Sequence, residues 1–261
     1  MITMKLKDKK GFICDMDGVI YHGNQLLPGV REFISWLKES GKKFLFLTNN
    51  SGRSPKELAQ KLSRMGLDID ESHFYTSGIS TAAYLAKQKP GCTAYVIGEA
   101  GLINALYNAG ITMNDVNPDY VVIGETANYN FANMCKAVRL CQGGAKLIGT
   151  NPDATGPAEG GVIEPACRAL VSPIEIATGK PAYFLGKPNP LMMRSALSIL
   201  GCNEEEIAII GDRMDTDIIA GIESEIDTVL VLTGVTSRGE VENFPYRPKY
   251  ILDGVKDVMD N

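Results

Sequence analysis

The sequence is poor in histidine, has no closely paired cysteines and contains no long apolar run. Its two histidines, His22 and His73, argue against a histidine-based zinc site and against a Ser-His-Asp triad. The six cysteines are scattered without a CxxC spacing, which is typical of reduced thiols in a cytoplasmic protein. No apolar run approaches the roughly 20 residues of a membrane-spanning helix. We therefore expect a cytoplasmic protein that has no membrane partner.

Excess basic charge and nucleotide-binding loops are also missing. The net charge is −5 and no basic stripe is present, which argues against a nucleic-acid partner, because its phosphates need basic side chains. Neither a G-x-x-x-x-G-K-[ST] loop nor a G-x-G-x-x-G loop after a strand occurs, so two common ways of cradling a nucleotide are excluded. With 44% hydrophobic and 22% charged residues, the 261-residue chain has an ordinary globular composition. It fits one large domain or two modest ones.

Short apolar runs alternate along the chain with segments of helical spacing. We predict strands at 12–14, 44–47, 94–97, 120–123, 147–148, 207–210 and 229–232. We predict a first helix that starts at Pro28-Gly29 and is stopped by Gly41, and further helices at 55–65, 81–88, 102–108, 131–140, 174–178 and 190–200. Another helix is expected after Asp217, through Gly221. Residues 21–27 are expected to form an irregular loop or a small flap, and residues 150–165 a loop. The alternation predicts an α/β protein with a mainly parallel sheet.

Polar side chains follow several of the predicted strands. Asp15 and Asp17 come directly after the apolar run 12–14, and their i, i+2 spacing points both carboxylates to one side. Two like charges in one place are costly without a cation, although a strand followed by an ordinary Asp-Gly turn is an alternative. Ligands bind beyond the carboxyl ends of parallel strands, so other polar groups at such ends are expected to join this pair. These groups are Thr48 and Asn49, Lys187, and Asp212 and Asp217.

Such a set of side chains can carry out phosphoryl transfer, although any one of them alone can equally be an ordinary loop residue. Asp15, Asp17 and Asp212 can supply oxygen ligands to Mg²⁺. The cation and Lys187 can together neutralise a phosphoryl group, while the Thr48 hydroxyl binds its oxygens. Phosphoryl transfer needs mainly charge neutralisation and alignment. One aspartate can attack phosphorus, and the second can protonate the leaving oxygen and then deprotonate water.

Taken together, these residues resemble the four motifs of the haloacid dehalogenase-like hydrolases. The motifs are Asp15-Met16-Asp17-Gly18-Val19, Thr48-Asn49, Lys187-Pro188 and Gly211-Asp212-x-x-x-x-Asp217. Thr-Asn-Asn-Ser at 48–51, Gly-Glu-Thr at 124–126 and Thr-Asn-Pro-Asp at 150–153 narrow the resemblance to the NagD-type branch. The resemblance covers nearly the whole chain and implies a Rossmann-like parallel-sheet core with an inserted α/β cap domain of C2 type. It implies a core at residues 1–81 and 182–261 and a cap at residues 82–181.

The resemblance also implies a role for each core residue. Asp15 is expected to be the nucleophile and a metal ligand. Asp17 is expected to be the general acid and base, with its backbone carbonyl on Mg²⁺. Asp212 is expected to complete the metal site, with Asp217 as support behind it. The expected phosphate-binding residues are Thr48, Asn49, Lys187, Arg213, Met214, Asp215 and Thr216.

The leaving group is expected to be selected by the cap. Our candidates are Glu125, Asn128, Asn151, Asp153 and the loop 154–164, although Asn151-Pro152-Asp153 can equally be a turn that starts a helix. The resemblance implies a Mg²⁺-dependent phosphomonoesterase of small phosphorylated metabolites, with ribonucleoside monophosphates such as UMP favoured and p-nitrophenyl phosphate also accepted. The alternatives are a phosphotransferase or phosphomutase that uses the same aspartyl phosphate, and a non-catalytic phosphometabolite-binding regulator. The resemblance also implies a possible homodimer formed through the cap.

Overall fold

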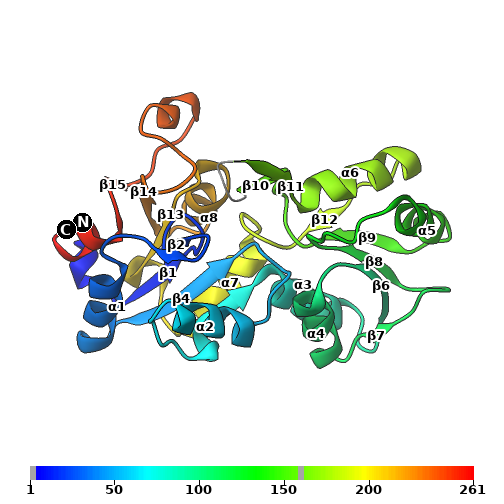
Figure 1. The fold of residues 1–261 in the computed structure, drawn as a ribbon, viewed down its shortest axis with the longest axis horizontal. Coiled ribbons are helices and arrows are strands. Elements are labelled where there is room, and N and C mark those ends of the chain that lie inside the picture. The colour runs from blue at the N-terminus through cyan, green and yellow to red at the C-terminus, as the bar shows by residue number, and fades with distance from the viewer. Residues whose placement is uncertain (1–3, 158–161) are drawn as a thin grey trace. The chain divides into compact units, whose positions relative to one another are not determined.

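The computed structural model describes residues 4–157 and 162–261, which form two compact units (Figure 1). The first unit comprises Met1–Leu47, Leu58–Tyr75 and Lys187–Asn261, and the second comprises Thr48–Glu57 and Thr76–Gly186. Residues 158–161, which belong to the loop expected to select the leaving group, lie outside the described residues. The expected α/β class is confirmed, whereas the cap boundaries at residues 82 and 181 stay a prediction.

A six-stranded sheet forms the centre of the first unit, in the order β15-β14-β13-β1-β4-β5. Its strands are β1 (Gly11–Cys14), β4 (Lys43–Thr48), β5 (Phe74–Thr76), β13 (Ile207–Gly211), β14 (Asp227–Val231) and β15 (Tyr250–Leu252). Strand β1 pairs in parallel with β13 on one side and with β4 on the other, so that Cys14 lies opposite Ile210 and Phe46. All four residues of β1 are buried, as expected of a central strand with both faces covered.

Helices and short turns complete the first unit. The helices are α1 (Val30–Glu39), α2 (Pro55–Arg64), α7 (Pro190–Leu200) and α8 (Ile219–Glu223), with one turn of π-helix at Met214–Ile218. Short 3₁₀ turns lie at Leu6–Asp8, Glu71–His73, Glu204–Glu206, Glu240–Asn243 and Val255–Met259. The predicted flap is a small antiparallel hairpin of β2 (Tyr21–His22) and β3 (Gln25–Leu26). It lies between β1 and α1 in the chain, close in sequence to the Asp-x-Asp motif.

Helix α1 shows how the spacing of apolar residues produces packing. Val30, Phe33, Ile34 and Leu37 recur at helical spacing, and all four are buried. The ring of Phe33 packs edge-on against Phe12 of β1, with the ring centroids 6.1 Å apart. Burying an apolar side chain of this size contributes roughly 1.5–3 kcal/mol. The apolar stripe therefore holds α1 against the central strand whose carboxyl end carries the aspartates.

The second unit has a sheet of its own, entirely parallel, in the order β12-β9-β8-β6-β7. Its strands are β6 (Thr93–Ile97), β7 (Thr112–Met113), β8 (Tyr120–Ile123), β9 (Lys146–Gly149) and β12 (Tyr183–Phe184). Its helices are α3 (Ser77–Gln88), α4 (Ala100–Asn108), α5 (Phe131–Gln142) and α6 (Cys167–Thr178). A separate antiparallel pair, β10 (Thr155–Pro157) and β11 (Ile163–Pro165), lies where a loop was predicted. Residues of β8, α5 and α6 share one buried core, for example Val121, Ala137 and Val171.

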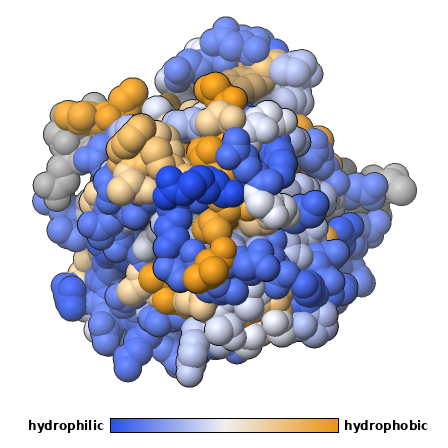
Figure 2. Space-filling model, turned by 90° about the vertical axis from the view of Figure 1, so that its right-hand side faces the viewer, coloured by the Kyte–Doolittle hydropathy of each residue, from blue (hydrophilic) through white to orange (hydrophobic). Residues whose placement is uncertain are grey.

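The surface is hydrophilic with scattered apolar patches, as Figure 2 shows for one face. In the second unit, Tyr107, Phe131 and Ile176 are 74%, 75% and 83% exposed. Single exposed apolar residues are normal on protein surfaces, so these side chains assign no partner by themselves. Among the described residues, no helix combines the length and the apolar character that crossing a bilayer requires.

Candidate active site

Three carboxylates from separate segments meet in the first unit. Asp15, Asp212 and Asp217 each offer an oxygen that lies within 4.8 Å of the others. Asp15 directly follows β1, and its backbone N–H donates to the carbonyl of Ile210 in β13 at 2.8 Å. Asp212 directly follows β13, so the parallel pairing of β1 with β13 brings the two acids to the same sheet edge. Asp217 comes from the π-helical turn that follows.

The ammonium group of Lys187 faces these acids. Its Nζ lies 2.5 Å from Asp15 Oδ1 and 2.6 Å from Asp217 Oδ1, and it donates to the carbonyl of Leu47 at 3.0 Å. Lys187 is only 2% exposed. Burial alone would lower the pKa of Lys187, but the charges of Asp15 and Asp217 outweigh it and raise that pKa. The side chain is therefore a fixed positive charge beside Asp15.

If all three carboxylates were ionised, they would carry more negative charge than Lys187 balances. Burial raises the pKa of Asp15, and the neighbouring Asp217 and Asp212 raise it further, while Lys187 lowers it. Burial and then the charge of Asp217 raise the pKa of Asp212 from its ordinary 3.8 to about 7. Lys187 is ion-paired with Asp15 and Asp217, and the charges of Lys187 and Arg213 lower the pKa of Asp212 without overcoming its burial. The excess negative charge and the oxygen donors fit a hard divalent cation.

The remaining predicted residues of the first unit lie around this cluster. Asp17 is exposed, and its backbone forms a bridge to Tyr21. The guanidinium of Arg213 donates to the carboxylate of Asp215, with Nη2 and Oδ2 2.8 Å apart. Met214 and Thr216 are buried. The expected phosphate contacts of residues 213–216 and the acid–base role of Asp17 stay predictions.

A second polar cluster joins Asn49 to three of the four predicted cap candidates. The amide of Asn49 donates to Asp153 Oδ2 at 3.0 Å. Its carbonyl oxygen accepts from the amide of Asn151 at 2.7 Å and from the hydroxyl of Ser77 at 2.5 Å. The same amide of Asn151 donates to Glu125 Oε1 at 2.9 Å. These contacts fix the backbone directly after Thr48, the last residue of β4.

Thr48 and Asn128, two other predicted site residues, make backbone contacts within their own turns. The hydroxyl of Thr48 accepts from the backbone N–H of Asn50 at 3.1 Å, which shapes the turn after β4. Asn128 is exposed, and its backbone N–H donates to the hydroxyl of Thr126 rather than to the cluster around Asn49. Its role as a candidate for the leaving group stays a prediction.

Comparison with known protein families shows to which family the chain belongs. Residues 12–112 match the family model of haloacid dehalogenase-like hydrolases, and residues 184–258 match a second model of HAD-hydrolase-like proteins. The chain belongs to the haloacid dehalogenase-like hydrolase family. The predicted family is therefore confirmed.

Individual relatives of this hydrolase are phosphatases. The chain is 42% identical over 249 residues to dihydroxyacetone phosphatase of Corynebacterium glutamicum, covering 95% of this chain and 90% of that protein. It is 41% identical to the ribonucleotide monophosphatase NagD of Escherichia coli, covering 95% and 98%. Its fold matches a 4-nitrophenylphosphatase of Thermotoga maritima with a TM-score of 0.94 at 33% identity, covering 98% of each chain. The hydrolase is thus a NagD-type phosphatase, an enzyme acting on phosphoric monoesters.

Sequence analysis missed one segment of the hydrolase site. The backbone N–H of Val235 donates to Asp212 Oδ2 at 2.7 Å, yet residues after the strand predicted at 229–232 were assigned no role. A signal was available, because Thr233 and Gly234 follow a strand of the same parallel sheet and so lie at the same edge as Asp212. Ser77, which bonds to Asn49, carried no such signal.

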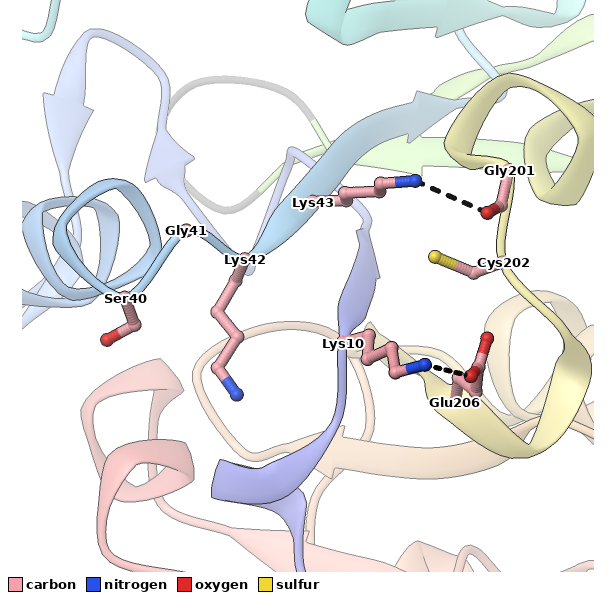
Figure 3. A pocket seen from close by; sticks show the side chains of 8 residues that line it. All are labelled: Lys10, Ser40, Gly41, Lys42, Lys43, Gly201, Cys202 and Glu206. Carbon is pink, nitrogen blue, oxygen red and sulfur yellow. Dashed lines mark hydrogen bonds and ion pairs between the residues drawn. The ribbon is translucent and has the colours of Figure 1, made fainter.

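A separate cavity of about 330 Å³ lies at the amino ends of β1 and β4, at the opposite edge of the sheet (Figure 3). It is lined by Lys10, Ser40, Gly41, Lys42, Lys43, Gly201, Cys202 and Glu206. The ammonium groups already have acceptors: Lys10 pairs with Glu206 at 2.5 Å, and Lys43 donates to the carbonyl of Gly201 at 3.3 Å. Lys42 donates to two backbone carbonyls of residues 7 and 9. These contacts account for the lysines, so we assign the cavity no ligand.

Proposed function

We propose that this hydrolase is a Mg²⁺-dependent phosphomonoesterase that acts on small phosphorylated metabolites through an aspartyl phosphate on Asp15. The observation that carries the proposal is the buried Lys187 ammonium, 2.5 Å from Asp15 and beside Asp212 and Asp217. A purely phosphate-binding module has no need of a second acid two residues after Asp15. Asp17 therefore favours a catalyst over the non-catalytic regulator.

The reaction proceeds in two steps on residues of this chain. A carboxylate oxygen of Asp15 attacks phosphorus, and the bond to the leaving oxygen breaks. Asp17 gives its proton to the leaving oxygen, then takes a proton from the water that attacks the aspartyl phosphate. The second attack frees inorganic phosphate and restores Asp15. Lys187 stays charged throughout, because its pKa is raised, and it compensates negative charge on the phosphoryl oxygens.

The cation site of the proposal consists of Asp15, Asp212 and the backbone carbonyl of Asp17. When bound there, Mg²⁺ supplies charge neutralisation at the phosphoryl oxygens. Neutralising these acids also favours the ionised, nucleophilic form of Asp15, whose pKa burial otherwise raises. Asp217 supports the site from behind by holding Lys187. Thr48, Asn49 and residues 213–216 stay the proposed phosphate contacts.

The substrate is less sharply indicated than the reaction. The relatives are named for dihydroxyacetone phosphate, ribonucleotides and 4-nitrophenyl phosphate, which share a phosphate monoester and differ in the leaving group. We favour a ribonucleoside monophosphate such as UMP, with Glu125, Asn128, Asn151 and Asp153 as candidates for reading the leaving group. Dihydroxyacetone phosphate is the second candidate, because its phosphatase is 42% identical to this chain.

A panel of phosphate esters tests the proposed function. Purified enzyme with Mg²⁺ is given UMP, dihydroxyacetone phosphate, a hexose phosphate and p-nitrophenyl phosphate, and inorganic phosphate is measured. We expect phosphate release from several esters without any added acceptor, with kcat/KM highest for UMP. Consumption of the ester only when an acceptor alcohol is present, with the phosphoryl group recovered on that alcohol and no inorganic phosphate formed, would support the phosphotransferase instead. A faster reaction with dihydroxyacetone phosphate would reject the preference for UMP.

Three further expectations remain proposals. We place the enzyme in the cytoplasm, because its cysteines have no disulfide or metal-binding spacing. We also propose residues 82–181 as the cap and a homodimer formed through it. Sedimentation equilibrium of the full chain tests the dimer, and a monomer at all accessible concentrations would reject it.

A further inference from the structure

The carboxylate of Asp212 is held from one side by residues Thr233–Thr236, here called the 233–236 segment. The backbone N–H of Val235 donates to Asp212 Oδ2 at 2.7 Å. The backbone N–H of Thr236 donates to the carbonyl oxygen of Asp212 at 3.0 Å. The segment therefore binds Asp212 at both its side chain and its main chain, which restricts the rotation of the carboxylate.

Two glycines allow the backbone to approach one oxygen of this carboxylate closely. A Cβ atom on Gly234 would lie 1.9 Å from Asp212 Oδ2, and a Cβ atom on Gly18 would lie 2.4 Å from the same oxygen. The Cβ of Gly18 would also lie 3.0 Å from the Cα of Gly234. Gly18 has φ +76°, which favours glycine independently of the space. The 233–236 segment and the loop after β1 thus both lie against the carboxylate of Asp212.

Thr233 links the 233–236 segment to the loop after β1 by a hydrogen bond. Its hydroxyl donates to the carbonyl oxygen of Gly18 at 2.6 Å. Its own carbonyl oxygen lies 2.7 Å from Nε2 of His22 in β2. Thr233 thus connects the loop that carries Asp15 and Asp17 to the segment that holds Asp212.

We propose that the 233–236 segment is a positioning element for the cation site and that Thr233 is its positioning residue. The inference rests on the proposed function in one respect, because it takes Asp212 as a ligand of Mg²⁺. A carboxylate whose orientation is fixed before the cation arrives loses less freedom on binding. Partners that orient metal ligands are typically worth about 10–100-fold in metal affinity. Thr233 is expected to act on Mg²⁺ affinity in this way, through Gly18 and Gly234.

Paired variants of Thr233 test the proposal. Thr233→Val removes the hydroxyl and keeps the branched shape, whereas Thr233→Ser keeps the hydroxyl. The readout is the apparent Mg²⁺ dissociation constant, obtained without substrate from the rise in Tm with Mg²⁺ concentration. We expect about tenfold weaker binding for Thr233→Val and near wild-type binding for Thr233→Ser. With p-nitrophenyl phosphate, Thr233→Val should need more Mg²⁺ for half-maximal activity and approach the wild-type kcat at saturation.

Thr228→Val is the matched control, since it makes the same chemical change in β14. The hydroxyl of Thr228 accepts from the backbone N–H of Lys249 at 2.9 Å, away from the cation site. We expect this variant to lose stability and keep the wild-type affinity for Mg²⁺. Gly234→Ala is the stronger perturbation and should weaken Mg²⁺ binding more than Thr233→Val does. If it fails to fold, the two Thr233 variants still decide.

Three results separate the possible failures. Equal Mg²⁺ affinity of Thr233→Val and wild type, both folded, would overturn the positioning role. Equal weakening in Thr228→Val would overturn it too, because loss of stability alone would then explain the effect. A third result concerns the wild-type enzyme. If Mg²⁺ does not change its Tm and EDTA does not lower its activity, the cation has no part in the proposed function.

Discussion

Replacing Asp212 by asparagine separates the charge of this side chain from its shape. Asp212 is 2% exposed, and burial and Asp217 raise its pKa from 3.8 to about 7. Each pH unit between the two values corresponds to roughly 1.4 kcal/mol, so the ionised carboxylate costs the cation-free fold up to about 4 kcal/mol at pH 8. Asparagine keeps an oxygen that can accept from Val235. We therefore expect Asp212→Asn to raise the free energy of unfolding by a few kcal/mol in EDTA at pH 8.

The pH dependence of stability gives the sign of the effect. Between pH 4 and pH 7 the folded state of the wild type holds a proton on Asp212 that the unfolded state has lost, because the folded pKa is the higher one. The unfolded state therefore binds fewer protons, and the Asp212 contribution to stability falls as pH rises through this window. Above pH 7 this contribution is constant. Asp212→Asn should remove this part of the pH dependence of the free energy of unfolding. At pH 4 its free energy of unfolding should equal that of the wild type.

Urea unfolding followed by circular dichroism measures both quantities. Wild type, Asp212→Asn and the control Asp253→Asn are compared in EDTA at pH 5 and pH 8. The side chain of Asp253 is 88% exposed, so its replacement should leave the free energy of unfolding nearly unchanged. Addition of Mg²⁺ at pH 8 should stabilise the wild type and the control, but not Asp212→Asn. The reasoning is refuted if Asp212→Asn is less stable than the wild type in EDTA at pH 8, or if Mg²⁺ stabilises it equally.

Three other outcomes are expected. Asp15→Asn should lower kcat for p-nitrophenyl phosphate by about 10³-fold or more while circular dichroism shows an intact fold; undiminished turnover would reject Asp15 as the nucleophile. EDTA should abolish phosphate release and Mg²⁺ should restore it, whereas full activity in chelator would remove the cation from the mechanism. Lys187→Met leaves the buried Asp217 and the largely covered Asp15 without their ion pair, so urea unfolding should show a loss of about 3–5 kcal/mol in the free energy of unfolding. If Lys187→Met unfolds at the same urea concentration as the wild type, Asp15 and Asp217 are already neutral in the folded protein.

The elements that carry the first unit were predictable because their apolar residues are continuous or strictly periodic. Strand β13 is an uninterrupted buried run, and α1 repeats its apolar residues at helical spacing. In a parallel sheet the ends of neighbouring strands meet, so the convergence of Asp15 and Asp212 followed from their positions in the chain. For Lys187 the strand-end reasoning was wrong, because the strand before it, β12, belongs to the sheet of the second unit. Side chains with charge at strand ends are the most visible signal that a sequence offers.

Elements fixed by tertiary packing were less predictable. The helix expected at 174–178 begins at Cys167 and contains Pro173 in its interior. Proline in a helix interior costs about 3 kcal/mol, but Cys167, Val171 and Ile174 are buried in the core of the second unit, which offsets that cost. The antiparallel β10–β11 pair lacks an alternating apolar pattern, and its exposed β11 residues gave no strand signal.

Backbone donors were invisible for a different reason. Val235 binds Asp212 through its backbone N–H, a group that every residue except proline carries. The bonds from Asn151 and Ser77 to the carbonyl of Asn49 are hidden in the same way. Such contacts depend on the path of the backbone, which a single sequence does not show.

A crystal structure with Mg²⁺ and beryllium trifluoride tests the central claim most directly, because this anion mimics a phosphoryl group bonded to a carboxylate. The account predicts beryllium bonded to an oxygen of Asp15, Mg²⁺ in contact with Asp15 and Asp212, and the Lys187 ammonium beside a fluorine. Beryllium trifluoride bonded to another carboxylate, or Mg²⁺ bound away from Asp212, would contradict it.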